Sequence, residues 1–244
     1  MATTLPYLYV VRLNVEDEAK EKIADWSNRW HMPDLLEVGF WAATRYRCVE
    51  GEPEYLHIYE ISGPELFDTE EYRYICRCDP PCGTVKCQNK ADPANPTGPQ
   101  MLRHNRDSSR MLYEQIVNYR TAEPRTQSPG RHGDPVGSVK SRTVWNVRVD
   151  VDPDVEEDFV TWQREVHMPE IGATPGFIAG RIGRRIDSFS TADPKYLVIW
   201  EIESPDVMKN LTAVAQRNIG EDEKRIRAGI KNRKDAVSVR IWPE

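Results

Sequence analysis

Hydrophobic and polar residues alternate in residues 7–15 and 144–151, which predicts a β-strand in each segment. Acidic residues follow each strand, and apolar residues then recur at three- to four-residue spacing over residues 18–30 and 155–166. That spacing predicts an amphipathic helix with one apolar face. In the second helix the predicted buried face comprises Val155, Phe159, Trp162 and Val166.

Further alternating segments predict two strands after each helix and one closing strand; they are residues 40–49, 55–61, 177–186, 196–202 and 237–242. A second helix is expected after Pro64 and again after Pro205. Residues 111–119 fill the place of the closing strand in the first half, although their pattern also allows a helix. The order β-α-β-β-α-β is that of a ferredoxin-like module.

The tripeptide His-Met-Pro occurs twice, each time with its histidine five residues after a tryptophan, as Trp26 with His31 and Trp162 with His167. Because these residue types are scarce, the match indicates a duplicated module. The similarity extends over the flanking strands. Arg12 recurs as Arg148 and Glu60 as Glu201, and these residues are predicted to form structural ion pairs across strands.

The repeat predicts two domains of about a hundred residues each, the usual domain size. The predicted boundaries are residues 1–124 for the first module, which carries a cysteine-rich insert at 76–109, residues 125–141 for a linker, and residues 142–244 for the second module. One face of each sheet is covered by its helices, and a second sheet is the natural partner for the other face. We therefore expect an α+β fold in which two ferredoxin-like modules pack sheet to sheet as an intrachain dimeric barrel.

Composition narrows the functional classes. The chain of 244 residues is 39% hydrophobic and 30% charged, with a formal net charge of −6 and no basic patch. Nucleic acid is therefore not an expected partner. No apolar run reaches the ~18–20 residues of a membrane span, and the first residues do not resemble a secretory signal, so a membrane partner is not expected and a cytoplasmic location is. Homo-oligomerisation is left open.

The insert contains four of the five cysteines, Cys76, Cys78, Cys82 and Cys87, with His104 downstream. Their density raises the hypothesis of a zinc site. The spacing lacks the paired C-x2-C knuckles of zinc sites, and reduced thiols are the alternative in a cytoplasmic protein, so no metal is assigned. His132 falls in the linker and is expected to be solvated.

Pro33 and Pro169 are expected to end the first helix of each module, which would place His31 and His167 at a helix C-terminus. A histidine there can act as a general acid or base, because its unperturbed pKa of about 6.5 lies near working pH. The alternative is that each ring caps the last helical carbonyls.

Aromatic and titratable residues on the first-module strands suggest a binding wall for a small apolar or aromatic ligand; they are Tyr9, Tyr46, His57, Tyr59 and Tyr113. Trp26 and Trp162 are further candidate substrate-binding residues, although a tryptophan on a helix face more often packs in the core. His57 corresponds to Val198 in the second module. The first module is therefore the favoured site, with His31, His57 and His167 as candidate catalytic residues.

The W-x4-H-x-P motif at the end of the first helix of a ferredoxin-like module resembles the EthD-like branch of the dimeric α+β barrel superfamily. The resemblance covers residues 7–72 and 144–242. It implies a barrel formed by the two copies within one chain, and it places His31 and His167 in a cleft. The superfamily includes cofactor-free monooxygenases, isomerases, cyclases and haem enzymes; the insert is a departure from its pattern.

These observations favour a cofactor-independent enzyme of isomerase, lyase or cyclase type, in which a histidine moves a proton to or from carbon in a small aromatic or carbonyl compound. One alternative is a non-catalytic small-molecule-binding barrel. Another is a haem- or metal-dependent oxidoreductase with a histidine ligand. Nucleotide-binding and hydrolase motifs such as G-x-G-x-x-G and G-x-S-x-G are absent from the sequence.

Overall fold

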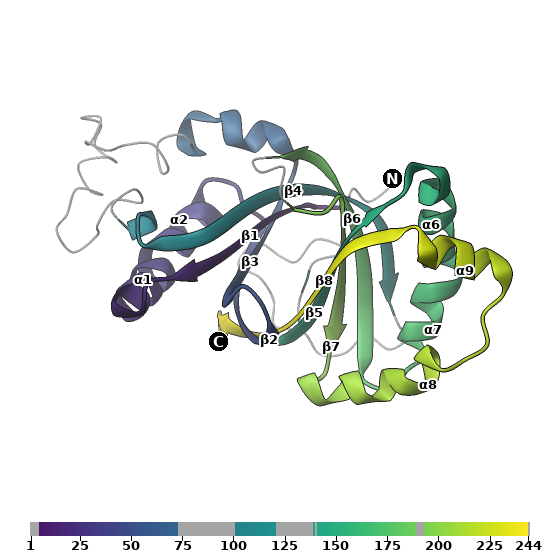
Figure 1. Cartoon of the computed structure of the whole chain (residues 1–244). Helices are drawn as coiled ribbons and strands as arrows, with labels where there is room; N and C mark the ends of the chain where they lie inside the picture. The colour runs from purple at the N-terminus through teal and green to yellow at the C-terminus, as the bar shows by residue number, and fades with distance from the viewer. Residues whose placement is uncertain (1–4, 73–100, 121–138, 140, 189–192, 244) are drawn as a thin grey trace.

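Eight antiparallel strands close into one barrel in the computed structural model of the chain, which describes residues 5–72, 101–120, 139, 141–188 and 193–243 (Figure 1). The strands are β1 (Tyr7–Val15), β2 (Ala42–Gly51), β3 (Tyr55–Ile61), β4 (Asn105–Arg120), β5 (Thr143–Val151), β6 (Phe177–Ser188), β7 (Tyr196–Ile202) and β8 (Ile230–Trp242). Their order around the barrel is β1-β3-β2-β8-β5-β7-β6-β4, and β4 pairs with β1 to close it.

The barrel consists of two sheets of identical topology, β4-β1-β3-β2 and β8-β5-β7-β6. We call β1–β4 with their helices the first module and β5–β8 with theirs the second module. The modules are joined through hydrogen-bonded pairs between β2 and β8 and between β4 and β6. The expected α+β fold, two ferredoxin-like modules forming an intrachain barrel, is confirmed. Residues 111–119 belong to strand β4, and the helical alternative for them is wrong.

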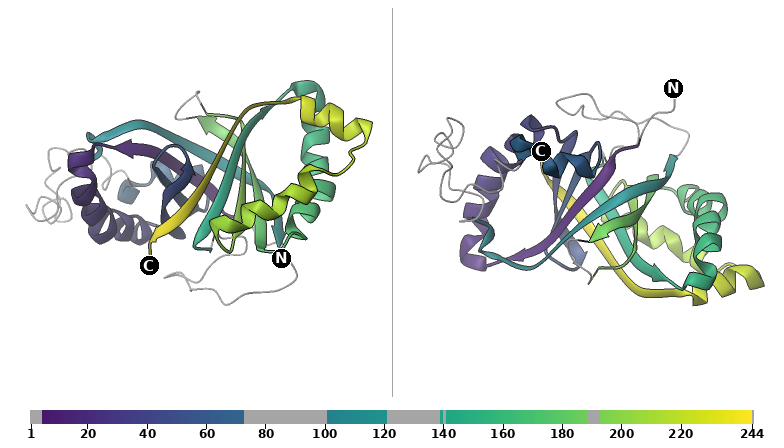
Figure 2. Two further views of the ribbon diagram at one scale, coloured as in Figure 1. Left: turned by 60° about the horizontal axis from the view of Figure 1, so that its bottom comes forward. Right: turned by 90° about the horizontal axis from the view of Figure 1, so that it is seen from above.

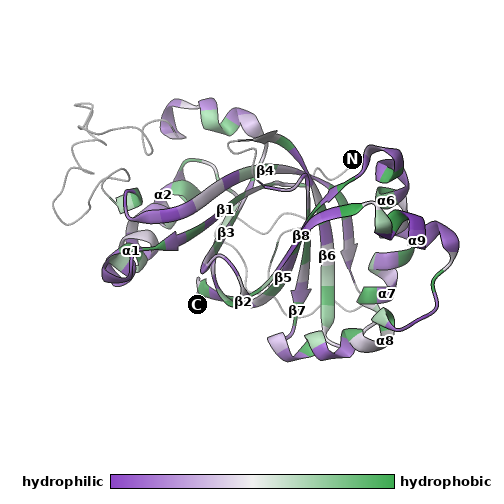
Figure 3. Ribbon diagram, viewed as in Figure 1, coloured by the Kyte–Doolittle hydropathy of each residue, from purple (hydrophilic) through white to green (hydrophobic). Residues whose placement is uncertain are grey.

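The helices lie on the outside of the barrel, one group over each sheet (Figure 2). They are α1 (Lys20–Trp26) and α2 (Met32–Glu37) in the first module, and α6 (Glu156–Trp162), α7 (Met168–Gly172), α8 (Thr212–Ala215) and α9 (Glu221–Ala228) in the second. Short 3₁₀ turns, Pro64–Asp68 and Pro205–Leu211, begin at the two expected prolines. The outer turns of α1 and α9 are predominantly hydrophilic, as expected for solvent-facing helices (Figure 3).

The first helix of each module does not end at its proline, and that expectation is wrong. A π turn at Ser27–His31 joins α1 to α2, and a π turn at Gln163–His167 joins α6 to α7. Within the first turn, the N–H of Met32 donates to the carbonyl of Ser27, five residues back. The wider turn changes the hydrogen-bond register just before the proline, which then lies in the first turn of the next helical segment and needs no N–H partner there.

The π turn explains the five-residue spacing between tryptophan and histidine. In a regular α-helix two such residues would point about 140° apart around the axis. In the π turn the His31 ring stacks on Trp26 with centroids 4.7 Å apart, and the His167 ring stacks on Trp162 at 4.4 Å. The changed phase also leaves Val166 40% exposed, although it was predicted on the buried face. The histidines therefore lie within a continuous helical segment, not at a C-terminus, and helix capping is not their role.

The turn from helix to strand requires a glycine at the same place in both modules. Gly39 has φ +107° and Gly176 has φ +91°, conformations that favour glycine. A Cβ at Gly176 would lie 2.4 Å from Cγ1 of Val207. At these two turns the chain reverses from α2 into β2 and from α7 into β6.

The barrel interior combines apolar residues with buried charges. Its apolar part is a cluster that includes Leu8, Val10, Tyr46, Met111, Tyr113, Val144, Leu197 and Ile199. Within it Arg12 and Arg148 each contact one oxygen of Asp193, at 3.1 and 3.2 Å. Glu201 contacts Arg181 at 2.5 Å. The recurring arginines and Glu201 therefore do form buried ion pairs, although the partners come from outside the repeated set.

Candidate active site

Register places one row of side chains across the outer face of the first sheet. Val11 on β1 is paired with Arg110 on β4 and with His57 on β3, and His57 is paired with Arg45 on β2. The adjacent row on the same face contains Leu112, Tyr9, Tyr59 and Ala43. Because residues directly opposite in adjacent strands lie about 4.5–5.5 Å apart, these two rows form a continuous wall beneath the helices.

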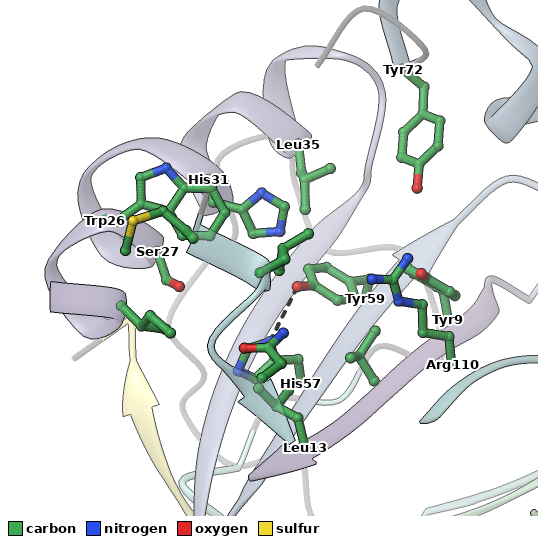
Figure 4. Close-up of a pocket in the computed structure, with 15 residues that line it drawn as sticks. Tyr9, Leu13, Trp26, Ser27, His31, Leu35, His57, Tyr59, Tyr72 and Arg110 are labelled. Atoms are coloured by element: carbon green, nitrogen blue, oxygen red, sulfur yellow. Dashed lines mark hydrogen bonds between the residues drawn. The ribbon is translucent and has the colours of Figure 1, made fainter. Parts of the chain in front are cut away.

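A cavity of about 110 Å³ lies between this wall and the helical segment (Figure 4). We call it the first cleft. Its strand side carries Tyr9, His57, Tyr59 and Arg110, and its helix side carries Trp26, Ser27, His31 and Leu35. The rings of Tyr9 and Tyr59 are stacked with centroids 5.5 Å apart. The lining is therefore largely aromatic, and its polar groups include two imidazoles, tyrosine hydroxyls, the hydroxyl of Ser27 and the guanidinium of Arg110.

A hydrogen-bonded chain runs along the sheet from Arg45 to Tyr59. Nε of Arg45 lies 3.3 Å from Nε2 of His57, and Nδ1 of His57 lies 3.3 Å from the hydroxyl of Tyr59. An arginine N–H can only donate, so Nε2 of His57 must accept. A neutral His57 then carries its proton on Nδ1 and donates it to the oxygen of Tyr59.

The surroundings keep His57 neutral. Burial lowers the pKa of His57 well below its ordinary value, and the positive charges of Arg45 and of a protonated His31 add to that effect. Arg45 is only 2% exposed, and burial lowers its pKa as well. Among the described residues Arg45 has no carboxylate partner within ion-pair distance. Its Nη1 instead donates to Oδ1 of Asn28 at 2.5 Å, which ties the sheet to the π turn.

The structure brings together some of the predicted site residues and separates others. His31, His57, Tyr9, Tyr59 and Trp26 all line the first cleft. Tyr46 and Tyr113 do not, because strand alternation turns them into the barrel interior. Tyr46 donates there to the carbonyl of Ser141 at 3.2 Å.

Sequence reasoning missed Arg45 and Arg110. Arg45 lies within a predicted strand, so its face could be inferred once the register was known, whereas Arg110 lies one residue before the predicted start of its strand. Register between strands distant in sequence is not encoded in a local pattern.

His167 and Trp162 line a separate cavity of about 160 Å³ in the second module, which we call the second cleft. The row equivalent to the one in the first sheet contains Asp235, Val147, Val198 and Ile182. It has no imidazole and no tyrosine. Burial lowers the pKa of His167 to about 4, with the nearby Arg227 charge second. The second cleft thus keeps a neutral histidine but lacks the hydrogen-bonded chain.

The cations of the second cleft are already paired. Arg233 donates two hydrogen bonds of 2.8 Å to the carboxylate of Asp235. Arg227 pairs with Glu223 at 2.8 Å and lies over the Trp162 ring at 5.4 Å. The equivalent clefts therefore differ in charge as well as in titratable groups.

The zinc hypothesis falls on residues that the structure does not describe. Cys76, Cys78, Cys82, Cys87 and His132 all lie outside the described ranges. His104 is described, and its Nδ1 lies 2.6 Å from a carboxylate oxygen of Glu16. Within the described ranges no group of three or more His, Cys, Asp or Glu residues could hold a metal ion.

A haem group, which the oxidoreductase alternative would require, does not fit either cleft. The two cavities have volumes of about 110 and 160 Å³. A cavity of about 150 Å³ holds a single benzene molecule, whereas a porphyrin is a macrocycle of four rings.

Several solved structures share this fold across nearly the whole chain. An anthrone oxidase-like protein superimposes with a TM-score of 0.63 and 13% identity, covering 98% of this chain and 92% of its own. A candidate monooxygenase from Lactobacillus acidophilus NCFM gives 0.54 and 11%, covering 97% and 94%. A chlorite dismutase variant from Candidatus Nitrospira defluvii gives 0.52 and 8%, covering 97% and 91%. The chain has the fold of the dimeric α+β barrel proteins, with both halves in one polypeptide.

Comparison at the sequence level adds little. The domain of unknown function DUF4286 matches residues 142–225, within the second module. No curated protein matches the chain. No helix among the described residues is long and apolar enough to cross a membrane.

Proposed function

We propose that the protein is a cofactor-independent enzyme of the EthD-like branch, which transfers a proton to or from carbon in a small aromatic carbonyl compound. Isomerase, lyase and cyclase outcomes all begin with this step. The observation that carries the proposal is the Arg45–His57–Tyr59 chain, which shares the first cleft with His31 and has no counterpart in the second. A purely structural motif would have no need of this asymmetry.

His31 is assigned as the general base. Its ring is half-buried and lines the cleft, with one face stacked on Trp26. The stack fixes the plane of the imidazole, so that a ring nitrogen can be aimed at a bound substrate without a loss of side-chain entropy at the moment of reaction. Removal of a proton from the carbon next to a carbonyl leaves an enolate, whose charge collects on the carbonyl oxygen.

Tyr59 is assigned as the donor to that oxygen. Since its own oxygen accepts from Nδ1 of His57, the hydroxyl proton of Tyr59 can be directed to the substrate. Successive hydrogen bonds polarise one another, so the chain from Arg45 strengthens the donation as negative charge develops. His57 acts through Tyr59 in this scheme and is a positioning residue.

The apolar part of the cleft supports an aromatic substrate. Tyr9, Trp26 and Tyr59 contribute ring surfaces, and a cavity of about 110 Å³ holds no more than a single six-membered ring. Tyr46 and Tyr113 have no part in the proposed site, because they face the barrel interior.

The test is deuterium exchange at carbon in D₂O, followed by proton NMR with phenylpyruvate, phenylacetaldehyde and benzoylacetone as probes. We expect exchange with at least one probe to exceed the buffer rate. His31→Ala should reduce the excess by about 10²–10⁴-fold, the range of general base catalysis. Tyr59→Phe should also reduce it.

His167→Ala is the matched control, because it removes the equivalent ring from the second cleft. It should leave exchange within about twofold of wild type, with urea unfolding measured on both variants to compare their stability. If no probe exchanges faster than in buffer, the proposal is contradicted and the non-catalytic binding barrel becomes the favoured function. Equal losses in the two histidine variants would also contradict the proposal.

A further inference from the structure

The first cleft carries positive charge that no acidic side chain of the described residues neutralises. Arg45 lies behind His57 and is 2% exposed, while Arg110 lies on the cleft wall at its exposed rim. Both occupy the same row across the sheet, with Val11 and His57 between them. Figure 4 shows the Arg110 side chain directed into the region of the Tyr9 and Tyr59 rings.

An exposed arginine is usually solvated, so a binding role for Arg110 is inferred from its position in the cleft. The second module supplies an internal comparison, because Asp235 holds the place of Arg110 and Ile182 holds that of Arg45. The carboxylate of Asp235 forms an ion pair with Arg233, and Arg227 forms an ion pair with Glu223. The duplicated scaffold thus does not require a cation at this point of the row, and only the cleft with the titratable chain has one.

We propose that the first cleft recognises an aromatic carboxylate and that Arg110 is the residue that binds the carboxylate. The ring of the ligand lies against Tyr9 and Tyr59, and its carboxylate reaches the guanidinium at the rim. Arginine suits this task because its planar fork can donate two parallel hydrogen bonds to one carboxylate. The inference deepens the proposed function, since it names the substrate class of that same site.

The experiment measures binding without turnover, by fluorine NMR titration of the full chain with 4-fluorobenzoate and 4-fluorobenzamide. The two probes are nearly isosteric and differ in charge. We expect the benzoate to bind wild type at least tenfold more tightly than the benzamide. In Arg110→Gln the preference should fall to threefold or less, while benzamide affinity stays within twofold. High salt should weaken benzoate binding in wild type, because the ion pair is at an exposed rim.

Arg164→Gln is the matched control, since it removes one positive charge from an exposed arginine in the second module. It should retain the tenfold preference. Equal affinity of the wild type for both probes, or an unchanged preference in Arg110→Gln, would overturn the inference. Failure of the proposed catalysis is separately visible: a protein that prefers benzoate but exchanges no carbon-bound proton keeps Arg110 as a binding residue and loses only the enzymatic function.

Discussion

The Nε–H of Arg45 donates to Nε2 of His57 over 3.3 Å, whereas the equivalent strand pair of the second module is Ile182 facing Val198. A buried cation next to a buried imidazole is costly unless it is hydrogen-bonded, so the pair is unlike the apolar filling of the second module. The hydrogen bond from Arg45 fixes the tautomer of His57. His57 in turn fixes the direction of the hydroxyl of Tyr59. The two modules share a fold and differ in this polar row.

Replacement of Arg45 by Met should release His57 without changing the wall of the cavity. We expect the pKa of His57 to rise, because the Arg45 charge is one cause of its depression. Nitrogen NMR of the imidazole should show loss of the single tautomer. Exchange at carbon should fall by about tenfold or more, with a shifted pH profile. Arg47→Met, an exposed arginine on the same strand, should change none of these. An unaltered tautomer in Arg45→Met would contradict the assignment.

Acid should destabilise the protein in part through His167. Its pKa is about 4 in the folded state, against about 6.5 for an unperturbed histidine. Between these values the unfolded chain binds a proton that the folded chain does not, so stability falls as pH is lowered from 6.5 towards 4. The contribution to the slope approaches about 1.4 kcal/mol per pH unit at most.

The measurement is urea unfolding at several pH values for wild type and His167→Gln. The variant should lose stability overall, because the stack on Trp162 is altered, yet its stability should depend less steeply on pH over this interval. Parallel curves for the two proteins would show that His167 is not buried as a neutral ring. His57, whose pKa is also lowered, contributes in the same direction in both proteins and cancels in the comparison.

The strand pattern and the repeated motif were sufficient to predict the fold. Period-two alternation predicted seven strands, six of them within a few residues of their observed bounds, and the duplication of Trp26 and His31 as Trp162 and His167 indicated that the second sheet would cover the first. The observed β4 and β8 are longer than predicted, because most of their first six residues are exposed and polar and carry no hydrophobic alternation.

The site was predicted in part. His31, His57 and Tyr59 were chosen from residue type and from the difference between modules, and they do share a cleft. The π turn escaped prediction because a proline normally signals the end of a helix. Arg45 and Arg110 were missed because their role depends on cross-strand register, which pairs Arg45 with His57, 12 positions away, and Arg110 with Val11, 99 positions away, and which is decided by packing.

Truncation of one partner in the barrel interior should be strongly destabilising. Arg181 is fully buried and its Nη2 contacts Glu201 at 2.5 Å, while Glu201 also accepts from the backbone N–H of Ser141. Arg181→Met removes the cation that pairs with the buried carboxylate of Glu201 and should lower the free energy of unfolding by about 3–5 kcal/mol. The double variant with Glu201→Gln should lose less than the sum of the single losses. Strict additivity in chemical unfolding would contradict a direct pair.

One cross-strand pair differs in side-chain size between the two modules, and the first-module pair can be introduced into the second module by mutation. Gly180 lies opposite Trp200, and a Cβ there would come within 2.8 Å of the indole ring; the equivalent pair in the first module is Ala43 with Tyr59. Gly180→Ala should therefore destabilise the protein by about 1–3 kcal/mol through overpacking. Adding Trp200→Tyr, which recreates the first-module pair, should restore part of that loss, whereas Trp200→Tyr alone should leave a cavity and lower stability. The melting temperatures of the two single variants and the double variant decide the point, and a double variant no more stable than Gly180→Ala would show that the indole is not what excludes the methyl group.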